Sequence, residues 1–314
     1  MIAEILLILG AAVVLDFALG DPPNRVHPTA WIGRLIGAVT PKLKSQNGVV
    51  EKVRGSVAVI AIVSLVTLST YYFLHFIENF VGIVALIIVS IILLKSTIAI
   101  KGMEIHARSV MDAIANNDIA AARTKLSGIV GRDTSNLDEQ HILSATIESV
   151  GESTVDGITS PIFYFAFLGI PGAFTYRAIN TLDSMLGYKD DYHKNIGWFS
   201  AHLDTIANYI PARITAFLMV VASRIVGADW KNSLHMMKRD SYNTPSMNGG
   251  WPMATIAGAL RVRLEKNGYY SLGESYEHLT LQHCEKAISI MKVTALLFCV
   301  VFALPVIILT SLLW

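Results

Sequence analysis

Four long, mainly apolar segments constrain the fold of this 314-residue chain more than any other feature. They cover residues 2–19, 56–77, 80–100 and 291–313. A helix needs about 20 mainly apolar residues to cross the hydrocarbon core of a bilayer, and each segment is close to that length. Charged residues make up 16% of the chain, against about 25% in soluble domains. The sequence therefore predicts an all-α, polytopic integral membrane protein with four clear spans.

Two shorter apolar segments, residues 160–174 and 209–226, leave the number of spans open. The first is interrupted by Pro161, Gly169 and Pro171. If both segments crossed the bilayer, the polar residues between them would lie on the opposite side from the polar regions before and after. Irregular backbone is tolerated at membrane depth where protein surrounds it. We therefore expect broken or re-entrant segments that keep the polar regions on one side.

The remaining sequence forms four polar regions, at residues 21–55, 101–159, 175–208 and 227–290. The first contains six basic residues, which are Arg25, Arg34, Lys42, Lys44, Lys52 and Arg54. By the positive-inside rule this loop is cytoplasmic. Apolar residues recur at helical intervals after Lys101, which predicts amphipathic cytoplasmic helices whose charges mostly face water. We expect one membrane-embedded domain, residues 1–314, in the cell membrane.

Composition excludes some partners. The net charge of +1 is unlike the basic surface of a nucleic-acid-binding protein, and the two isolated cysteines predict no disulfide framework.

One charge in the first span needs an explanation, because an ionised carboxylate at the bilayer centre costs at least ~2.5 kcal/mol. Asp16 either pairs with Arg25, His27 or Arg34, or extends its carboxylate to the interface.

An acidic stripe lies in the second polar region. If residues 138–156 form one helix, His141, Glu148, Glu152 and Asp156 lie within roughly 80° of one another at ~100° per residue. No Lys or Arg separates them, whereas a water-facing helix surface usually mixes both signs. Magnesium is often held by one or two carboxylates together with substrate phosphates. The stripe is therefore either a metal or substrate site, or a solvated face.

Two further clusters combine arginine with amides and acids. The segment 176–187 places Arg177, Asn180 and Asp183 within two helical turns, and Asp204 precedes Asn208 by four residues. Near a membrane, arginine often extends along apolar surface toward water, but beside amides and acids it can also bind phosphate through its two parallel N–H groups. Arg213 stands at the start of the apolar segment that ends at Val226. A later turn rich in Ser, Asn and Gly, which follows Arg239 and contains Asn248, either presents backbone N–H groups to an anion or is an ordinary loop.

The motifs carry a resemblance over nearly the whole chain. DPPNRVHP (21–28), NTLDSM (180–185) and NYIPAR (208–213) occur in this order. The chain resembles the adenosylcobinamide-phosphate synthase family of cobalamin biosynthesis, known as CobD or CbiB. The resemblance implies a membrane ligase that uses ATP and Mg²⁺ to join adenosylcobyric acid, a corrinoid, to an amino-alcohol phosphate such as aminopropanol phosphate. It also implies contact with lipid and with other membrane proteins of cobalamin assembly.

The implied chemistry suggests roles for the candidate residues. Phosphoryl transfer depends mainly on positioning and charge neutralisation. Glu148, Glu152 and Asp156 are expected to hold magnesium, with Asp183 beside them or taking part in catalysis. Asp204 or His141 is expected to accept the proton of the attacking amine. Phosphate or substrate binding is expected from Arg132, Arg177, Asn180, Asn208, Arg213, Arg239 and Asn248.

Some features depart from this interpretation. The chain contains no GxxxxGK[ST] sequence, so nucleotide binding would need another geometry. Relative to the common family pattern, it has Ser153 after Glu152, Thr205 after Asp204 and Met247 after Ser246, which affects the detailed contacts to metal and amino alcohol. The alternative function is a transporter of a small anion, since transporters also use broken helices and acids at membrane depth.

Overall fold

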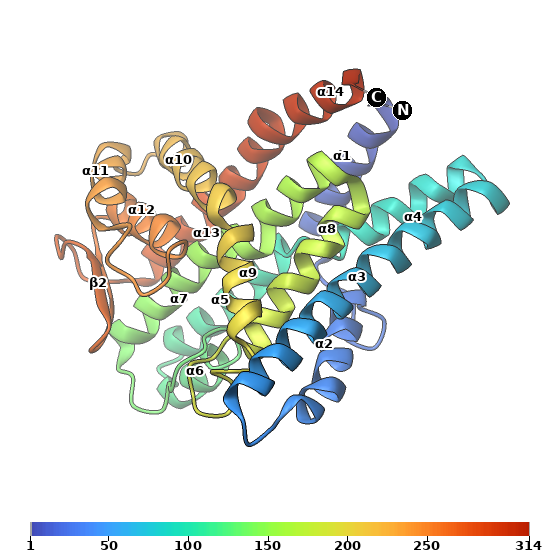
Figure 1. Ribbon diagram of the computed structural model, residues 1–314. Coiled ribbons are helices and arrows are strands. Elements are labelled where there is room, and N and C mark those ends of the chain that lie inside the picture. The colour runs from blue at the N-terminus through green and yellow to red at the C-terminus, as the bar shows by residue number, and fades with distance from the viewer. Residues whose placement is uncertain (1, 314) are drawn as a thin grey trace. The chain divides into compact units, whose positions relative to one another are not determined.

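The computed structural model describes residues 2–313, and almost all regular structure there is helical (Figure 1). The longer helices are α1 (Ile2–Leu19), α2 (Pro28–Val39), α3 (Gly48–Phe80), α4 (Ile83–Lys95), α5 (Ile100–Ala115), α6 (Ile119–Leu126), α7 (Glu139–Thr154), α8 (Ser160–Leu186), α9 (Trp198–Ala207), α10 (Tyr209–Ile225), α11 (Trp230–Asp240), α12 (Gly250–Leu260), α13 (Leu281–Leu297) and α14 (Leu304–Leu313). Short turns of 3₁₀ and π-helix lie at Thr40–Leu43, Val155–Thr159 and Phe298–Ala303. The predicted all-α class is confirmed.

Five helical stretches within residues 2–313 are long and apolar enough to cross a bilayer. They are Ile2–Leu19, Gly48–Phe80, Ile83–Ala115, Glu139–Leu186 and Leu281–Ser311. Four of them contain most or all of the spans expected from sequence, and the polytopic membrane class is confirmed. The fifth contains the segment 160–174. The segment 209–226 falls largely in a bent helix pair, Trp198–Ala207 with Tyr209–Ile225, whose axes differ by 46°.

The glycine and proline interruptions in residues 160–174 produce a kink. Gly169 has φ 64° and ψ −156°, a conformation outside the helical region, and Pro171 follows inside α8. A left-handed φ is accessible to glycine at little cost because it has no Cβ. Whether this segment crosses the bilayer or re-enters stays a prediction.

The chain divides into two compact units. Unit 1 contains the residues up to Ala99, Ser160–Asn208 and the residues from Phe302 onward, while unit 2 contains Ile100–Thr159 and Tyr209–Val301. In unit 1, α3 packs against α8 and α9, and α1 packs against α4 (Figure 1). In unit 2, α7 packs against α12, α13 and β1 (Arg263–Lys266).

The carboxylate buried in the first span has a partner that differs from the expected ones. Asp16 is 0% exposed, and its Oδ1 lies 3.6 Å from Nζ of Lys95 at the end of α4. Lys95 also contacts Asp21 at 3.3 Å and donates to the carbonyl of Gly20. Asp16 thus pairs with Lys95, which was not among the partners suggested from the sequence, because α4 brings a basic residue to the end of α1.

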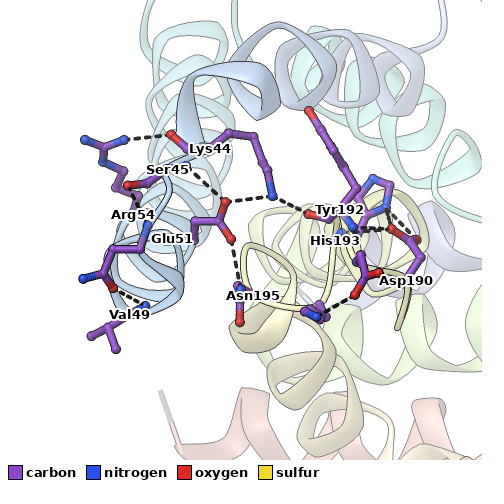
Figure 2. A network of polar contacts seen from close by, with 12 residues as sticks. Lys44, Ser45, Val49, Glu51, Arg54, Asp190, Tyr192, His193 and Asn195 are labelled. Atoms are coloured by element: carbon purple, nitrogen blue, oxygen red, sulfur yellow. Dashed lines mark hydrogen bonds and ion pairs between the residues drawn. The ribbon is translucent and has the colours of Figure 1, made fainter.

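A polar network anchors the start of α3 in unit 1. Figure 2 shows Glu51 between Lys44 and Asn195. Glu51 Oε1 lies 2.7 Å from Lys44 Nζ and accepts from the backbone N–H of Ser45 at 3.1 Å. Its Oε2 accepts from Asn195 at 3.0 Å. These bonds hold the chain before α3 against the loop that follows α8, which fixes one end of a 33-residue helix.

Unit 2 contains one element that the sequence did not predict. Strand β1 pairs with β2 (Tyr270–Gly273) in an antiparallel hairpin. The register places Lys266 opposite Tyr270, and Gly268 has a φ of 75° in the turn between them. Directly opposed residues of an antiparallel pair project from the same face, so Lys266 and Tyr270 project together.

Candidate functional site

The acidic stripe of α7 borders a small charged cavity in unit 2. The cavity has a volume of about 140 Å³. It is lined by Ile129, Val130, Gly131, Arg132, Ala145, Glu148, Ser149, Glu152, Lys266 and Tyr270. α7 begins at Glu139 because the side chain of Asp138 accepts from the backbone N–H of His141 at 2.9 Å, which satisfies a free donor in the first turn. Within this helix Glu148 and Glu152 are one turn apart and share a face.

Glu148 is fixed from both sides. It is 5% exposed. Its Oε1 accepts from Ser144 Oγ at 2.7 Å, and its Oε2 accepts from the hydroxyl of Tyr270 at 2.7 Å. Burial, and then the negative charge of Glu148, raise the pKa of the Tyr270 hydroxyl far above its usual value of 10.0. Tyr270 therefore stays protonated and acts as a donor that keeps the carboxylate in one orientation.

Arg132 lies in the same cavity with an unsatisfied donor. Its side chain is 12% exposed, and Nη2 lies 3.3 Å from Glu148 Oε2. Although this is within ion-pair distance, Nη2 is buried and forms no hydrogen bond. A buried N–H without a partner loses the hydration that it has in water, at a cost of about 1–3 kcal/mol. The arrangement suits an anion that would accept from this nitrogen.

The three predicted metal ligands are not gathered at one point. Glu148 and Glu152 line the cavity, but Asp156 does not. The reason is local: α7 ends at Thr154, and Val155–Thr159 forms a π-helical turn, so Asp156 leaves the α-helical register of the stripe. Within residues 2–313, no cluster of three or more His, Cys, Asp or Glu side chains is placed to hold a metal ion. Two carboxylates with room for phosphate oxygens still fit Mg²⁺, which often uses such a set.

The Ser, Asn and Gly turn approaches the stripe in unit 2. The Glu152 carboxylate lies against Gly249, where an added Cβ would come within 3.3 Å of Oε1. Arg213 holds this turn by donating from Nη1 to Asn248 Oδ1 at 2.9 Å and from Nη2 to the carbonyl of Met247 at 3.3 Å. The predicted substrate residues Arg213 and Asn248 thus contact each other.

Arg239 has carboxylate partners of its own. It forms two hydrogen bonds to Asp240, at 2.7 and 2.8 Å, and also pairs with Glu274. Asp240 accepts in addition from the backbone N–H of Gly273 at 2.7 Å. Burial opposes ionisation of Asp240, but the bonds from Arg239 and Gly273 outweigh it and keep the pKa of this carboxyl below its usual value. Arg239 thus ties the hairpin to the end of α11, and its expected contact with phosphate stays a prediction.

His141 lies outside the Glu148 cavity. Its Nδ1 is 2.6 Å from Asp138 Oδ1, and its Nε2 is 3.2 Å from Asn267 Oδ1 and 3.4 Å from Glu265 Oε1. Both ring nitrogens thus face oxygen acceptors, which favours the imidazolium form. A histidine accepts a proton only in its neutral form, so the carboxylate of Asp204 is the better of the two predicted bases.

Unit 1 contains a second polar cluster, centred on Asp204 and Asn208. Asp204 accepts from the side-chain amides of Asn180 at 3.4 Å and Asn208 at 3.0 Å. Asn208 is 1% exposed, and its carbonyl oxygen accepts from Ser160 at 2.6 Å and from Tyr176 at 2.9 Å. The donors that reach Asp204 are neutral amides, which stabilise its negative charge less than a cation would.

Arg177 and Asp183 also belong to unit 1. Arg177 donates from Nε to the carbonyl of Thr97 at 2.8 Å and from Nη1 to Asn180 Oδ1 at 3.5 Å. Asp183 lies one turn beyond Asn180 on α8. The structure thus brings Asn180, Asp204 and Asn208 together, with Arg177 beside Asn180.

Sequence reasoning missed Ser144, Lys266 and Tyr270. Ser144 lies four residues before Glu148 and could have been found by helical spacing. Lys266 and Tyr270 come from a hairpin whose strands have four residues each, too short for a clear alternating pattern.

These features define a polytopic helical membrane protein that carries a charged cavity suited to phosphate and a buried cluster of amides around one carboxylate. Comparison with known proteins identifies the family. The family model described as CobD/Cbib protein matches residues 9–300. The chain therefore belongs to the CobD/CbiB family.

Curated relatives agree with this assignment. The chain is 39% identical over 291 residues to the probable cobalamin biosynthesis protein CobD of Methanothermobacter thermautotrophicus, covering 93% of this chain and 94% of the relative. It is 40% identical to the cobalamin biosynthesis proteins CobD of Clostridium perfringens and Dehalococcoides mccartyi, covering 89% of this chain and 88% and 90% of those relatives. No solved structure matches the chain.

Proposed function

We propose that this protein acts in cobalamin biosynthesis as an ATP-dependent, amide-forming ligase of the cell membrane. It would join adenosylcobyric acid to an amino-alcohol phosphate, aminopropanol phosphate or a similar compound, to give adenosylcobinamide phosphate. Membership of the CobD/CbiB family supports the pathway. The observation that carries the reaction type is the cavity in which two carboxylates and two cations meet, including a buried Arg132 nitrogen without a hydrogen bond.

A carboxylate is a poor acyl donor because its oxygen is a poor leaving group. In the proposed first step, a propionate oxygen of the corrinoid attacks the γ-phosphorus of ATP, the bond to ADP breaks, and an acyl phosphate forms. Arg132 and Lys266 would neutralise charge on the phosphoryl oxygens. Glu148 and Glu152 would hold Mg²⁺, which when bound neutralises phosphate charge. Both carboxylates line the cavity, which supports this assignment.

In the proposed second step, the amine nitrogen attacks the acyl carbon. The C–N bond forms, the C–O bond to phosphate breaks, and phosphate leaves with the electron pair. The nitrogen loses a proton, and Asp204 is the proposed acceptor because it is held by the neutral amides of Asn180 and Asn208. Asp183 and Arg177 are proposed to orient the substrates from the same helix as Asn180.

The substrates also suit a membrane protein. A corrinoid is large and amphiphilic, so binding at the membrane interface would cover its apolar edge while its propionate and amide groups face water. The proposed partners are the corrinoid, the amino-alcohol phosphate and membrane lipid, together with other membrane proteins of cobalamin assembly. The spans of the chain support a multi-pass location in the cell membrane.

The test supplies purified protein in detergent with adenosylcobyric acid, aminopropanol phosphate, ATP and Mg²⁺. Mass spectrometry should detect the amide, and ADP and phosphate should form in equal amounts with it. Omitting ATP or the amine should abolish the product. Absence of the amide from folded preparations that bind the corrinoid would refute the ligase function.

A further inference from the structure

The hairpin closes one side of the Glu148 cavity. Lys266 and Tyr270 are register partners on β1 and β2, and both line the cavity. Antiparallel partners project from the same face, so the hairpin supplies a cation and a hydroxyl donor at one place. Arg239 and Asp240 hold the far end of the hairpin through Gly273. Lys266 and Tyr270 are therefore presented by an anchored element.

An unsatisfied donor in the cavity favours an anionic group. Arg132 and Lys266 supply two positive charges beside the carboxylates of Glu148 and Glu152, and Arg132 Nη2 is buried without a hydrogen-bond partner. An anion accepting from this nitrogen would remove the cost of leaving it unsatisfied. Glu148 Oε2 lies 3.3 Å from this nitrogen, within ion-pair distance, but it accepts its hydrogen bond from Tyr270 at 2.7 Å and none from Arg132 Nη2.

The size of the cavity limits the ligand. A water molecule takes up about 30 Å³ in the liquid, so a cavity of about 140 Å³ has room for a group of roughly five heavy atoms. A phosphoryl group has this size, whereas a nucleoside or a corrinoid does not. Only the phosphate end of a larger ligand would enter.

We propose that the hairpin completes a phosphate-binding site, in which Lys266 and Arg132 bind the phosphoryl oxygens and Tyr270 positions Glu148. Tyr270 is a positioning residue: its bond to Oε2 keeps Glu148 from turning toward Arg132 Nη2. Without that hydroxyl, Glu148 would form a hydrogen bond with Arg132 Nη2 and withdraw this nitrogen from the ligand. The carrier of the phosphate is either ATP or the amino-alcohol phosphate, and this choice rests on the proposed function.

Binding by the full-length protein in detergent tests the site without turnover. Calorimetry is performed with tripolyphosphate, with ATP and Mg²⁺, and with O-phosphoethanolamine as the amino-alcohol phosphate. A hydrogen bond to a charged group corresponds to roughly a tenfold or larger change in affinity. Lys266→Gln and Tyr270→Phe should each weaken binding by about this factor or more, and Lys266→Arg should retain it.

Matched controls separate binding from folding. Tyr269 is 68% exposed beside Tyr270, and Lys286 is exposed on α13. Tyr269→Phe and Lys286→Gln should bind like the wild type. Tyr270→Phe should also raise the Mg²⁺ concentration needed for half-maximal ATP binding, at an unchanged melting temperature, which a purely structural role would not do.

Each outcome decides a separate point. If ATP and tripolyphosphate bind and depend on Lys266, the site holds a nucleotide phosphate. If O-phosphoethanolamine alone binds and depends on Lys266, the site holds the amino-alcohol phosphate. Binding of tripolyphosphate that depends on Lys266, in a protein that forms no amide, would support the site while refuting the ligase. Phosphate binding unaffected by Lys266→Gln and Tyr270→Phe, with the ligase active, would overturn the site alone.

Discussion

The buried pair of Asp16 and Lys95 provides a quantitative test of how α1 and α4 are held together. Asp16 is 0% exposed and the Lys95 side chain 9% exposed, with 3.6 Å between Oδ1 and Nζ. Lys95→Met removes the positive charge and leaves the carboxylate buried beside an apolar group. Breaking a buried pair in this way costs about 3–5 kcal/mol. At about 2–4 °C per kcal/mol for a chain of this order of size, the melting temperature should fall by roughly 6–20 °C.

The double variant distinguishes pairing from packing. Asp16→Asn combined with Lys95→Met removes both charges, and replacing both members of a buried pair is often nearly neutral. The double variant should therefore recover most of the stability lost in Lys95→Met. Lys194→Met is the matched control, because Lys194 pairs with Asp191, which is 97% exposed, and its melting temperature should not change. Thermal unfolding in detergent, followed by tryptophan fluorescence, measures all four proteins. A Lys95→Met protein as stable as the wild type, or a double variant no more stable than Lys95→Met, would refute the reasoning.

Three further predictions concern packing, pH and the Asn248 turn. Gly55→Ala should lower the free energy of unfolding by about 1–3 kcal/mol, because a Cβ there would overlap the carbonyl of Ile196. Gly10→Ala is the control and should not destabilise the protein, since the space around Gly10 is open. Equal melting temperatures for the two variants would contradict this prediction. Because the pKa of Asp240 is lowered in the folded state, its stabilisation is complete above its usual pKa of 3.8 and is lost as the pH falls through the lower folded value. The excess melting temperature of the wild type over Asp240→Asn should thus be constant above about pH 5 and shrink as the pH falls below 3.8. An excess that stays constant in acid would exclude this linkage. Arg213→Lys should lose the two bonds to the turn and speed hydrogen exchange at residues 246–249; unchanged exchange would show that Arg213 does not hold it.

Hydropathy predicted the membrane spans because each depends on a local run of apolar residues. The partner of Asp16 was not predictable in the same way, because Lys95 lies 79 positions along the chain and only packing of α1 against α4 brings it near. Similarly, Glu104 had been assigned to a region of mostly water-facing charges, yet it is buried against Lys292 at 2.7 Å and Arg108 at 2.9 Å. Helical periodicity places a residue on a face but does not say which face another helix will cover.

The candidate site was likewise predictable only where its residues lie close together in sequence. Spacing placed Glu148 and Glu152 together, and the structure brings both to one cavity. Helical spacing wrongly extended the acidic stripe to Asp156. The π-helical turn at Val155–Thr159 changes the helical register there, and hydropathy gives no signal for such a turn. Spacing could not find Tyr270, whose role depends on a hairpin more than 100 residues away from α7 in sequence.

The most direct test of the ligase function is amide formation by wild type, Glu148→Gln and Asp183→Asn, with Glu139→Gln as the matched control on an exposed position of α7. Each protein is given adenosylcobyric acid, aminopropanol phosphate, ATP and Mg²⁺, and product is measured by mass spectrometry. Wild type and Glu139→Gln should form adenosylcobinamide phosphate at similar rates. Glu148→Gln and Asp183→Asn should remain folded and form none, whereas wild-type rates in both variants would contradict the roles proposed for these carboxylates.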